Sequence, residues 1–142
     1  MKTTALRLAA MMMISSAAVL AGNAPSANAA AARIEAAIAK DERPDALQTI
    51  SLVADGAVLI DVRSQGEWSA GHAKGALLMP WRNIEQEAPA KLPNKDTPIV
   101  TYCAVGVRAW YGATSLRKLG YTHVTAMTGG FDDLKKAGYP TE

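Results

Sequence analysis

The chain has 142 residues, with 15 lysines and arginines against 13 aspartates and glutamates, a formal net charge of +2 at pH 7. Such a balance provides no basic surface that would attract nucleic acid or anionic lipid. The single cysteine, Cys103, excludes an internal disulfide, so the role of an unpaired thiol has to be explained.

The first 29 residues have the pattern of a secretory signal peptide. Lys2 and Arg7 form a basic start, residues 8–20 are apolar, and residues 27–29 read Ala-Asn-Ala. A membrane anchor is the alternative, but the apolar run is shorter than the roughly 20 residues that a spanning helix needs. We expect cleavage after Ala29 and a periplasmic or secreted protein with no membrane association after cleavage. The remaining 113 residues (142 − 29) carry 13 basic and 13 acidic side chains and suit one domain.

After the leader, the pattern alternates between helices and strands. Residues 30–43 are predicted as a helical arm, with apolar spacing from Arg33 to Lys40. The domain proper is predicted over 44–142. Its first helix opens at Pro44 and ends near Gly56, and "AVLIDV" at 57–62 is a buried strand. Ser64 and Glu67 then have capping-box spacing for a short helix.

The second half continues the alternation. Strands are predicted at 75–80, 99–102 and 123–127, and the proline-rich residues 87–98 are predicted as a surface connection. A helix after Cys103 has an apolar stripe at Ala109, Ala113, Leu116 and Leu119, and residues 131–138 form the last helix. The pattern predicts an α/β domain with a mainly parallel sheet.

Cys103 follows a strand directly and precedes a helix. Asp61 and Arg63 follow another strand, so all three are expected at the carboxyl edge of the sheet, where ligands bind. Backbone N–H groups and the helix dipole can converge there on the sulfur and favour its anionic, reactive form. Gly106 permits a tight turn with positive φ, and Arg108 adds a charge in the first helical turn. The alternative is an inert buried cysteine.

Three separated segments resemble a single-domain rhodanese: "LIDVRSQGEWSAGHAKGALLMP" (59–80), "IVTYCAVGVRA" (99–109) and "LGYTHVTAMTGG" (119–130). The resemblance implies a five-stranded parallel sheet with helices on both faces. It also implies that Cys103 takes sulfane sulfur from a small anionic donor such as thiosulfate, becomes a persulfide, and passes the sulfur to cyanide or a thiol, including a protein thiol. No metal or cofactor is implied. The substrate-binding loop that it implies comprises Ala104, Val105, Gly106, Val107 and Arg108.

The loop departs from the family at Ala104 and Val105, where many members have polar or charged residues. We therefore expect Arg108 to bind the donor, with bracing of the loop against a backbone carbonyl as the alternative role. Asp61 and Arg63 are interpreted as supporting scaffold, with an Arg63–Glu67 salt bridge at helical spacing. Phe131 and Leu134 lie in the region where the family usually has a tryptophan. We expect this difference to affect packing alone.

The remaining candidates are interpreted as structural. His72 belongs to a Gly-His turn rather than acting as a base, and His123 has no acidic or cysteine partner nearby in sequence that would make a metal site. Trp68, Trp81 and Trp110 are expected to pack in or around the core.

The sequence leaves two other functions to consider. A cysteine phosphatase on this fold needs five residues between cysteine and arginine to encircle phosphate, whereas residues 104–107 supply four. A non-catalytic or slow sulfur-carrier or binding module remains an open alternative.

Overall fold

Residues 27–142 are described by a computed structural model of the chain. The first 26 residues of the predicted signal peptide lie outside the described part. The helices are α1 (Ala27–Ala39), α2 (Ala46–Ala54), α3 (Gln65–Ser69), α4 (Ile84–Lys91), α5 (Val107–Lys118) and α6 (Phe131–Lys136). The strands are β1 (Val58–Asp61), β2 (Leu77–Leu78), β3 (Ile99–Tyr102) and β4 (Val124–Ala126). None of the helices within residues 27–142 is long and apolar enough to cross a membrane.

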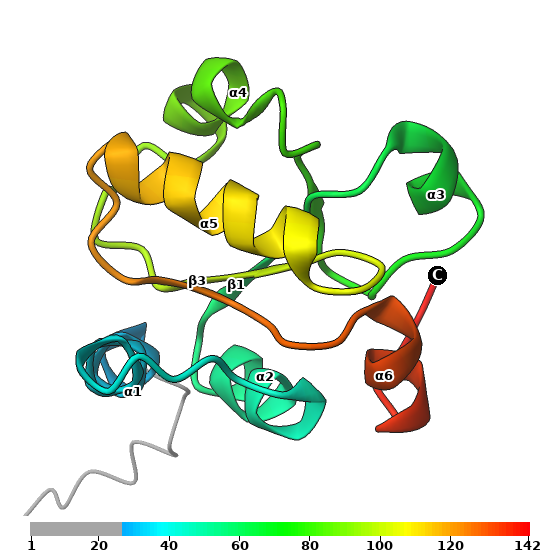
Figure 1. Cartoon of the computed structure of the whole chain (residues 1–142), viewed down its shortest axis with the longest axis horizontal. Coiled ribbons are helices and arrows are strands. Elements are labelled where there is room, and N and C mark those ends of the chain that lie inside the picture. The colour runs from blue at the N-terminus through cyan, green and yellow to red at the C-terminus, as the bar shows by residue number, and fades with distance from the viewer. Residues whose placement is uncertain (1–26) are drawn as a thin grey trace, which may run out of the picture.

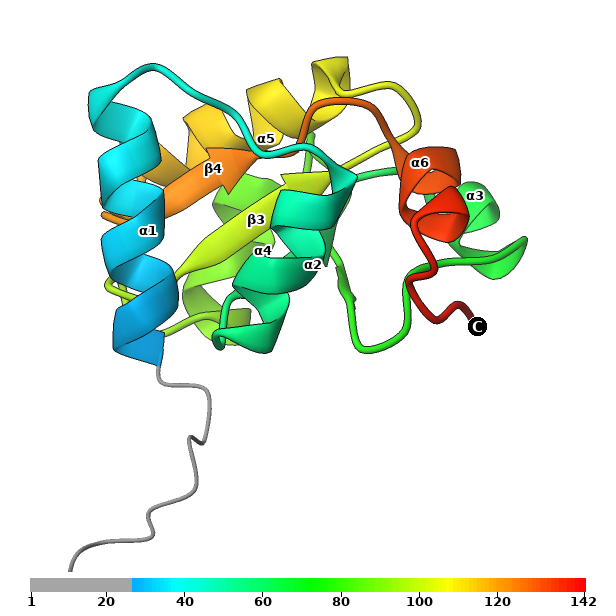
Figure 2. The ribbon, with the colours of Figure 1, turned by 90° about the horizontal axis from the view of Figure 1, so that it is seen from below.

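The sheet has four parallel strands in the order β2-β1-β3-β4. The α/β class with a parallel sheet is confirmed, but five strands is wrong. The four strands are those that the apolar runs predict, and the fifth was implied by the family resemblance alone. The alanine-rich arm folds as helix α1, packed against α2 and β4 (Figure 2). Burial of Ile34 in this arm stabilises its docking by about 2 kcal/mol.

Helices cover both faces of the sheet (Figure 1). One apolar cluster joins α4 and α5 to alternate strand residues, including Ile60, Ile99 and Cys103. The other joins α1, α2 and α6 to the strand residues that point to the opposite face of the sheet, including Val100 and Tyr102. Because side chains alternate along a strand, Cys103 points to the α5 side and its neighbour Tyr102 to the α2 and α6 side.

Capping fixes the start of two helices. Asp45 and Gln48 form a capping box, so α2 begins at Ala46, two residues after the predicted Pro44. The predicted capping box of Ser64 and Glu67 is present and begins α3. Each box satisfies N–H groups that would otherwise lack partners, and loss of such a cap costs about 1 kcal/mol.

Helix α4 was missed, since residues 87–98 were predicted as a surface connection. It contains Pro89, which removes an N–H donor and disfavours helix in a sequence pattern. Burial of Ile84 and Ala88 against α5 overrides that preference. The Tyr121 hydroxyl donates to the carbonyls of Ala88 at 3.0 Å and Leu92 at 2.6 Å, which fixes the end of the helix.

Candidate active site

Cys103 lies where β3 ends, and its side chain is completely buried. The Gly106 backbone N–H donates a hydrogen bond to the Cys103 sulfur, with 3.0 Å between nitrogen and sulfur. Such a hydrogen bond stabilises a negatively charged thiolate more than a neutral thiol. Of the loop amides that were predicted to converge on the thiol, the Gly106 N–H contacts the sulfur.

The loop after Cys103 turns sharply at Gly106, whose φ of 97° is in the left-handed region, as predicted. Gly106 is the N-cap of α5, and Arg108 lies in the first turn of this helix, also as predicted. Val105 and Val107 are exposed, the former at 74%. Together with Gly106, Trp110, Tyr111 and Arg43, which comes from outside the helix, they line a surface pocket of about 240 Å³ at this end of α5.

A turn after β4 supports the loop from the other side. The Phe131 N–H donates to the Cys103 carbonyl at 2.9 Å. A Cβ atom placed on Gly130 would overlap the Ala104 carbonyl and lie 2.8 Å from the Cys103 carbonyl oxygen. Glycine is required at Gly130 because the two backbones touch directly. This contact fixes the height of the loop above the sheet.

Arg108 binds a carboxylate of the protein itself. Its Nη1 and Nη2 donate to the two carboxylate oxygens of Glu67 at 2.6 and 2.9 Å, which joins α5 to α3. The hydrogen bond from Arg108, with help from the Ser64 cap, lowers the pKa of Glu67 to about 2. The same hydrogen bond raises the pKa of Arg108. The only charged side chain of the loop is thus neutralised by a partner.

Asp61 and Arg63 form a buried network beneath the site, but the predicted Arg63–Glu67 pair is wrong. Arg63 instead donates to Asp61, with the shortest contact 2.7 Å, and to the Gly71 carbonyl. The Tyr102 hydroxyl donates to Asp61 at 2.6 Å, and burial followed by this hydrogen bond raises the pKa of Tyr102. Glu67 is unavailable to Arg63 because Arg108 holds both of its oxygens.

The histidines have structural surroundings. The His72 ring stacks on Trp68 with centroids 3.5 Å apart, and its Nδ1 lies 3.0 Å from the Trp68 carbonyl oxygen. His123 lies 3.9 Å from Glu35, a weakly placed and exposed partner. Residues 27–142 contain no group of three or more histidine, cysteine or acidic side chains placed to hold a metal ion.

The aromatic residues differ in burial. Trp81 packs partly buried against the α4 and α5 cluster, as predicted. Trp110 is 46% exposed and contacts Tyr111 edge-on, so it belongs to the rim of the loop.

Arg43 is a site residue that sequence reasoning missed. It comes from the segment between α1 and α2, and its side chain hydrogen-bonds the Gly106 carbonyl at 3.0 Å. No local pattern could have found it, because this partner lies 63 residues away in the chain.

The sequence profile of the rhodanese-like domain matches residues 45–137. This chain belongs to the rhodanese family. Thiosulfate sulfurtransferase GlpE of Haemophilus influenzae is 33% identical over 95 residues, which cover 67% of this chain and 89% of that protein. Thiosulfate sulfurtransferase PspE of Escherichia coli is 29% identical over 75 residues, covering 53% and 71% respectively.

The solved structures agree with the rhodanese assignment. The solution structure of a rhodanese-like domain from Anabaena sp. has a TM-score of 0.64 at 30% identity, and the match covers 70% of this chain and 77% of that one. The matched profile includes the whole loop from Cys103 to Arg108 but begins two residues after Arg43. The arm therefore brings a contact to the rhodanese loop from outside the matched segment.

Proposed function

We propose that this protein transfers sulfane sulfur from thiosulfate or a similar small anionic donor to cyanide or a thiol through a persulfide on Cys103. The hydrogen bond from the Gly106 N–H to the Cys103 sulfur, at the turn from β3 into α5, carries this proposal. Membership of the rhodanese family and relatives named thiosulfate sulfurtransferase support sulfurtransferase activity.

The chemistry proceeds in two displacements. The Cys103 thiolate attacks the outer sulfur of thiosulfate, the S–S bond of the donor breaks, and sulfite leaves with the electron pair. Cyanide or a thiolate then attacks the outer sulfur of the persulfide, and the Cys103 thiolate is regenerated as that S–S bond breaks. Negative charge stays on or beside the sulfur throughout, where the Gly106 N–H and the start of α5 stabilise it.

We propose that Arg108 binds the donor while it stays paired with Glu67. Glu67 takes one N–H of each terminal nitrogen, so a donor would be bound through the N–H groups of the guanidinium that remain. The Gly106 N–H hydrogen-bonds the sulfur itself.

A slow sulfur-carrier or binding module is the second candidate, favoured by the complete burial of Cys103 and the exposed Val105 beside it. A thiosulfate:cyanide assay on the wild type and on Cys103→Ala separates the two functions. We expect thiocyanate production by the wild type and none by the variant at equal melting temperature. Equal background rates for both folded proteins would favour the binding module.

We also propose that the protein is exported and acts in the periplasm or outside the cell. The proposal is supported by the basic start, apolar stretch and Ala-Asn-Ala ending of residues 1–29. The predicted cleavage point, between Ala29 and the buried Ala30, falls within α1. Intact mass of the periplasmic protein should correspond to a chain that begins at Ala30, and a soluble species retaining residues 1–29 would refute export.

A further inference from the structure

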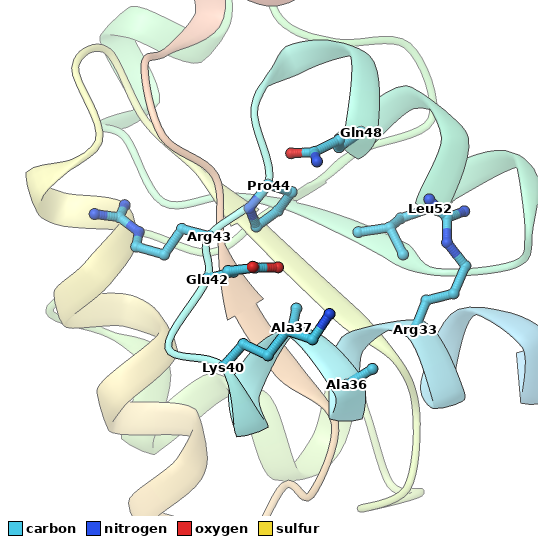
Figure 3. A pocket seen from close by; sticks show the side chains of 9 residues that line it. All are labelled: Arg33, Ala36, Ala37, Lys40, Glu42, Arg43, Pro44, Gln48 and Leu52. Atoms are coloured by element: carbon cyan, nitrogen blue, oxygen red, sulfur yellow. The ribbon is translucent and has the colours of Figure 1, made fainter.

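Arg43 connects the N-terminal arm to the loop of Cys103. Its Nε donates to the Ala126 carbonyl at 3.0 Å, and its Nη2 donates to the carbonyls of Gly106 at 3.0 Å and Met127 at 2.8 Å. One half-buried side chain therefore joins the end of β4 to the start of α5. Figure 3 shows Arg43 extending away from Lys40 and Glu42, its neighbours along a 370 Å³ pocket between α1 and α2.

Gly106 is held through both its N–H and its carbonyl. When Gly106 directs its N–H inward to the Cys103 sulfur, its carbonyl points out of the loop toward the arm. This carbonyl also accepts the first helical hydrogen bond of α5, from the Trp110 N–H at 3.2 Å, so Arg43 is its second donor. Arg43 ties this oxygen to the carbonyls of Ala126 and Met127 and so fixes the position from which Gly106 directs its N–H to the sulfur.

Arg43 also differs from Arg108 in its charge environment. Arg108 is paired with Glu67, whereas no ion pair of Arg43 occurs within residues 27–142. Its partners are neutral carbonyl oxygens, so its positive charge is not balanced by a bonded carboxylate. A charge bonded to the Gly106 peptide favours negative charge on the sulfur in contact with that residue.

We propose that Arg43 is a positioning residue for sulfur transfer: its guanidinium holds the Gly106 carbonyl, which keeps the Gly106 N–H on the Cys103 sulfur. This role rests on the proposed function and adds a residue from outside the segment that the rhodanese profile matches. Arg43, the last residue of the N-terminal arm, thereby becomes part of the active site.

Single-turnover kinetics on the full chain test this role, with persulfide formation followed at increasing thiosulfate concentration. In Arg43→Met the limiting rate should fall about tenfold or more, since removal of one charge-stabilising donor from an enzyme site costs about 10²–10³ when it acts directly. Arg43 also lines the pocket beside Val105 and Val107, so the half-saturating thiosulfate concentration separates two roles. For a positioning residue it should change little, and a large rise would indicate direct donor binding and overturn the positioning role. Arg43→Lys should recover part of the rate, because an ammonium keeps the charge and can bond one or two of the carbonyls.

Arg33→Met is the matched control. Arg33 belongs to the same arm but binds Ser51 and Asp55 on α2 and its C-cap, away from the loop. This variant should keep the wild-type limiting rate even if its melting temperature falls. A wild-type limiting rate in Arg43→Met, or an equal loss in Arg33→Met, would overturn the positioning role alone. Absence of persulfide formation in the wild type would overturn the proposed function and this role with it.

Discussion

Substitution of Gly130 by alanine should displace the loop of Cys103 without touching any side chain of the site. The added Cβ would overlap the Ala104 carbonyl, and even the Cys103 carbonyl oxygen would lie only 2.8 Å away. Gly130 has an extended backbone, with φ of −156°, so the effect is purely steric. Both obstacles are backbone atoms, so they cannot rotate aside and the loop has to retreat by about 1 Å or more.

The expected size follows from this displacement. Overpacking of this kind costs about 1–3 kcal/mol of the free energy of unfolding, and a displacement near 1 Å in a catalytic group can reduce the rate by about 10²-fold. We expect Gly130→Ala to melt several degrees lower and to lose about 10²-fold in kcat/KM in the thiosulfate:cyanide assay at a temperature where it is folded.

The matched control for this prediction is Gly66→Ala. The nearest atom to a Cβ at Gly66 is the Ser64 hydroxyl oxygen, 4.0 Å away, and the residue lies within α3. Alanine is the better helix former, so Gly66→Ala should be as stable as the wild type or more so, with full activity. A Gly130→Ala protein with wild-type kcat/KM and melting temperature would refute the direct packing of the turn on the loop.

Three further predictions concern single residues around the site. Arg108 lowers the pKa of Glu67 from 4.5 to about 2. The ion pair therefore stabilises the folded protein at pH values above 4.5, the pKa in the unfolded chain, and this stabilisation is lost as the pH falls toward 2. The melting temperature of Glu67→Gln should thus decline less steeply than that of the wild type below about pH 5, and parallel declines would contradict the pairing. Tyr102→Phe removes the 2.6 Å hydrogen bond to buried Asp61, and urea denaturation should show a loss of about 1–3 kcal/mol. A Tyr102→Phe protein as stable as the wild type would count against this network. His72→Ala should lower stability through lost stacking but keep kcat within a few-fold, whereas a loss of about 10²-fold would reveal a general base.

Local rules predicted much of this fold because they act between residues close in the chain. The β-forming run at residues 99–102 identified β3, with Cys103 directly after it. The capping box at Ser64 and the positive φ of Gly106 followed from side-chain chemistry and from the absence of a Cβ, respectively. The family resemblance supplied the general architecture and, in the case of the fifth strand, an element that this chain lacks within residues 27–142.

The contacts that complete the candidate site were beyond sequence reasoning because they join distant segments. Glu67 has helical spacing to Arg63, yet it binds Arg108, 41 residues away, since the fold brings α3 beside the start of α5. The three carbonyl partners of Arg43 lie 63 to 84 residues away and carry no side-chain signal. Helix α4 depends likewise on burial against α5, which overrides the disfavoured proline within it.

Intact-protein mass spectrometry after incubation with thiosulfate tests the Cys103 persulfide most directly. The wild type should gain the mass of one sulfur atom and lose it on addition of cyanide, as expected for a covalent intermediate. Cys103→Ala, folded to the same extent, should gain nothing. A wild-type protein that stays at its starting mass in excess thiosulfate, or an adduct that persists in Cys103→Ala, would contradict sulfur transfer through this residue.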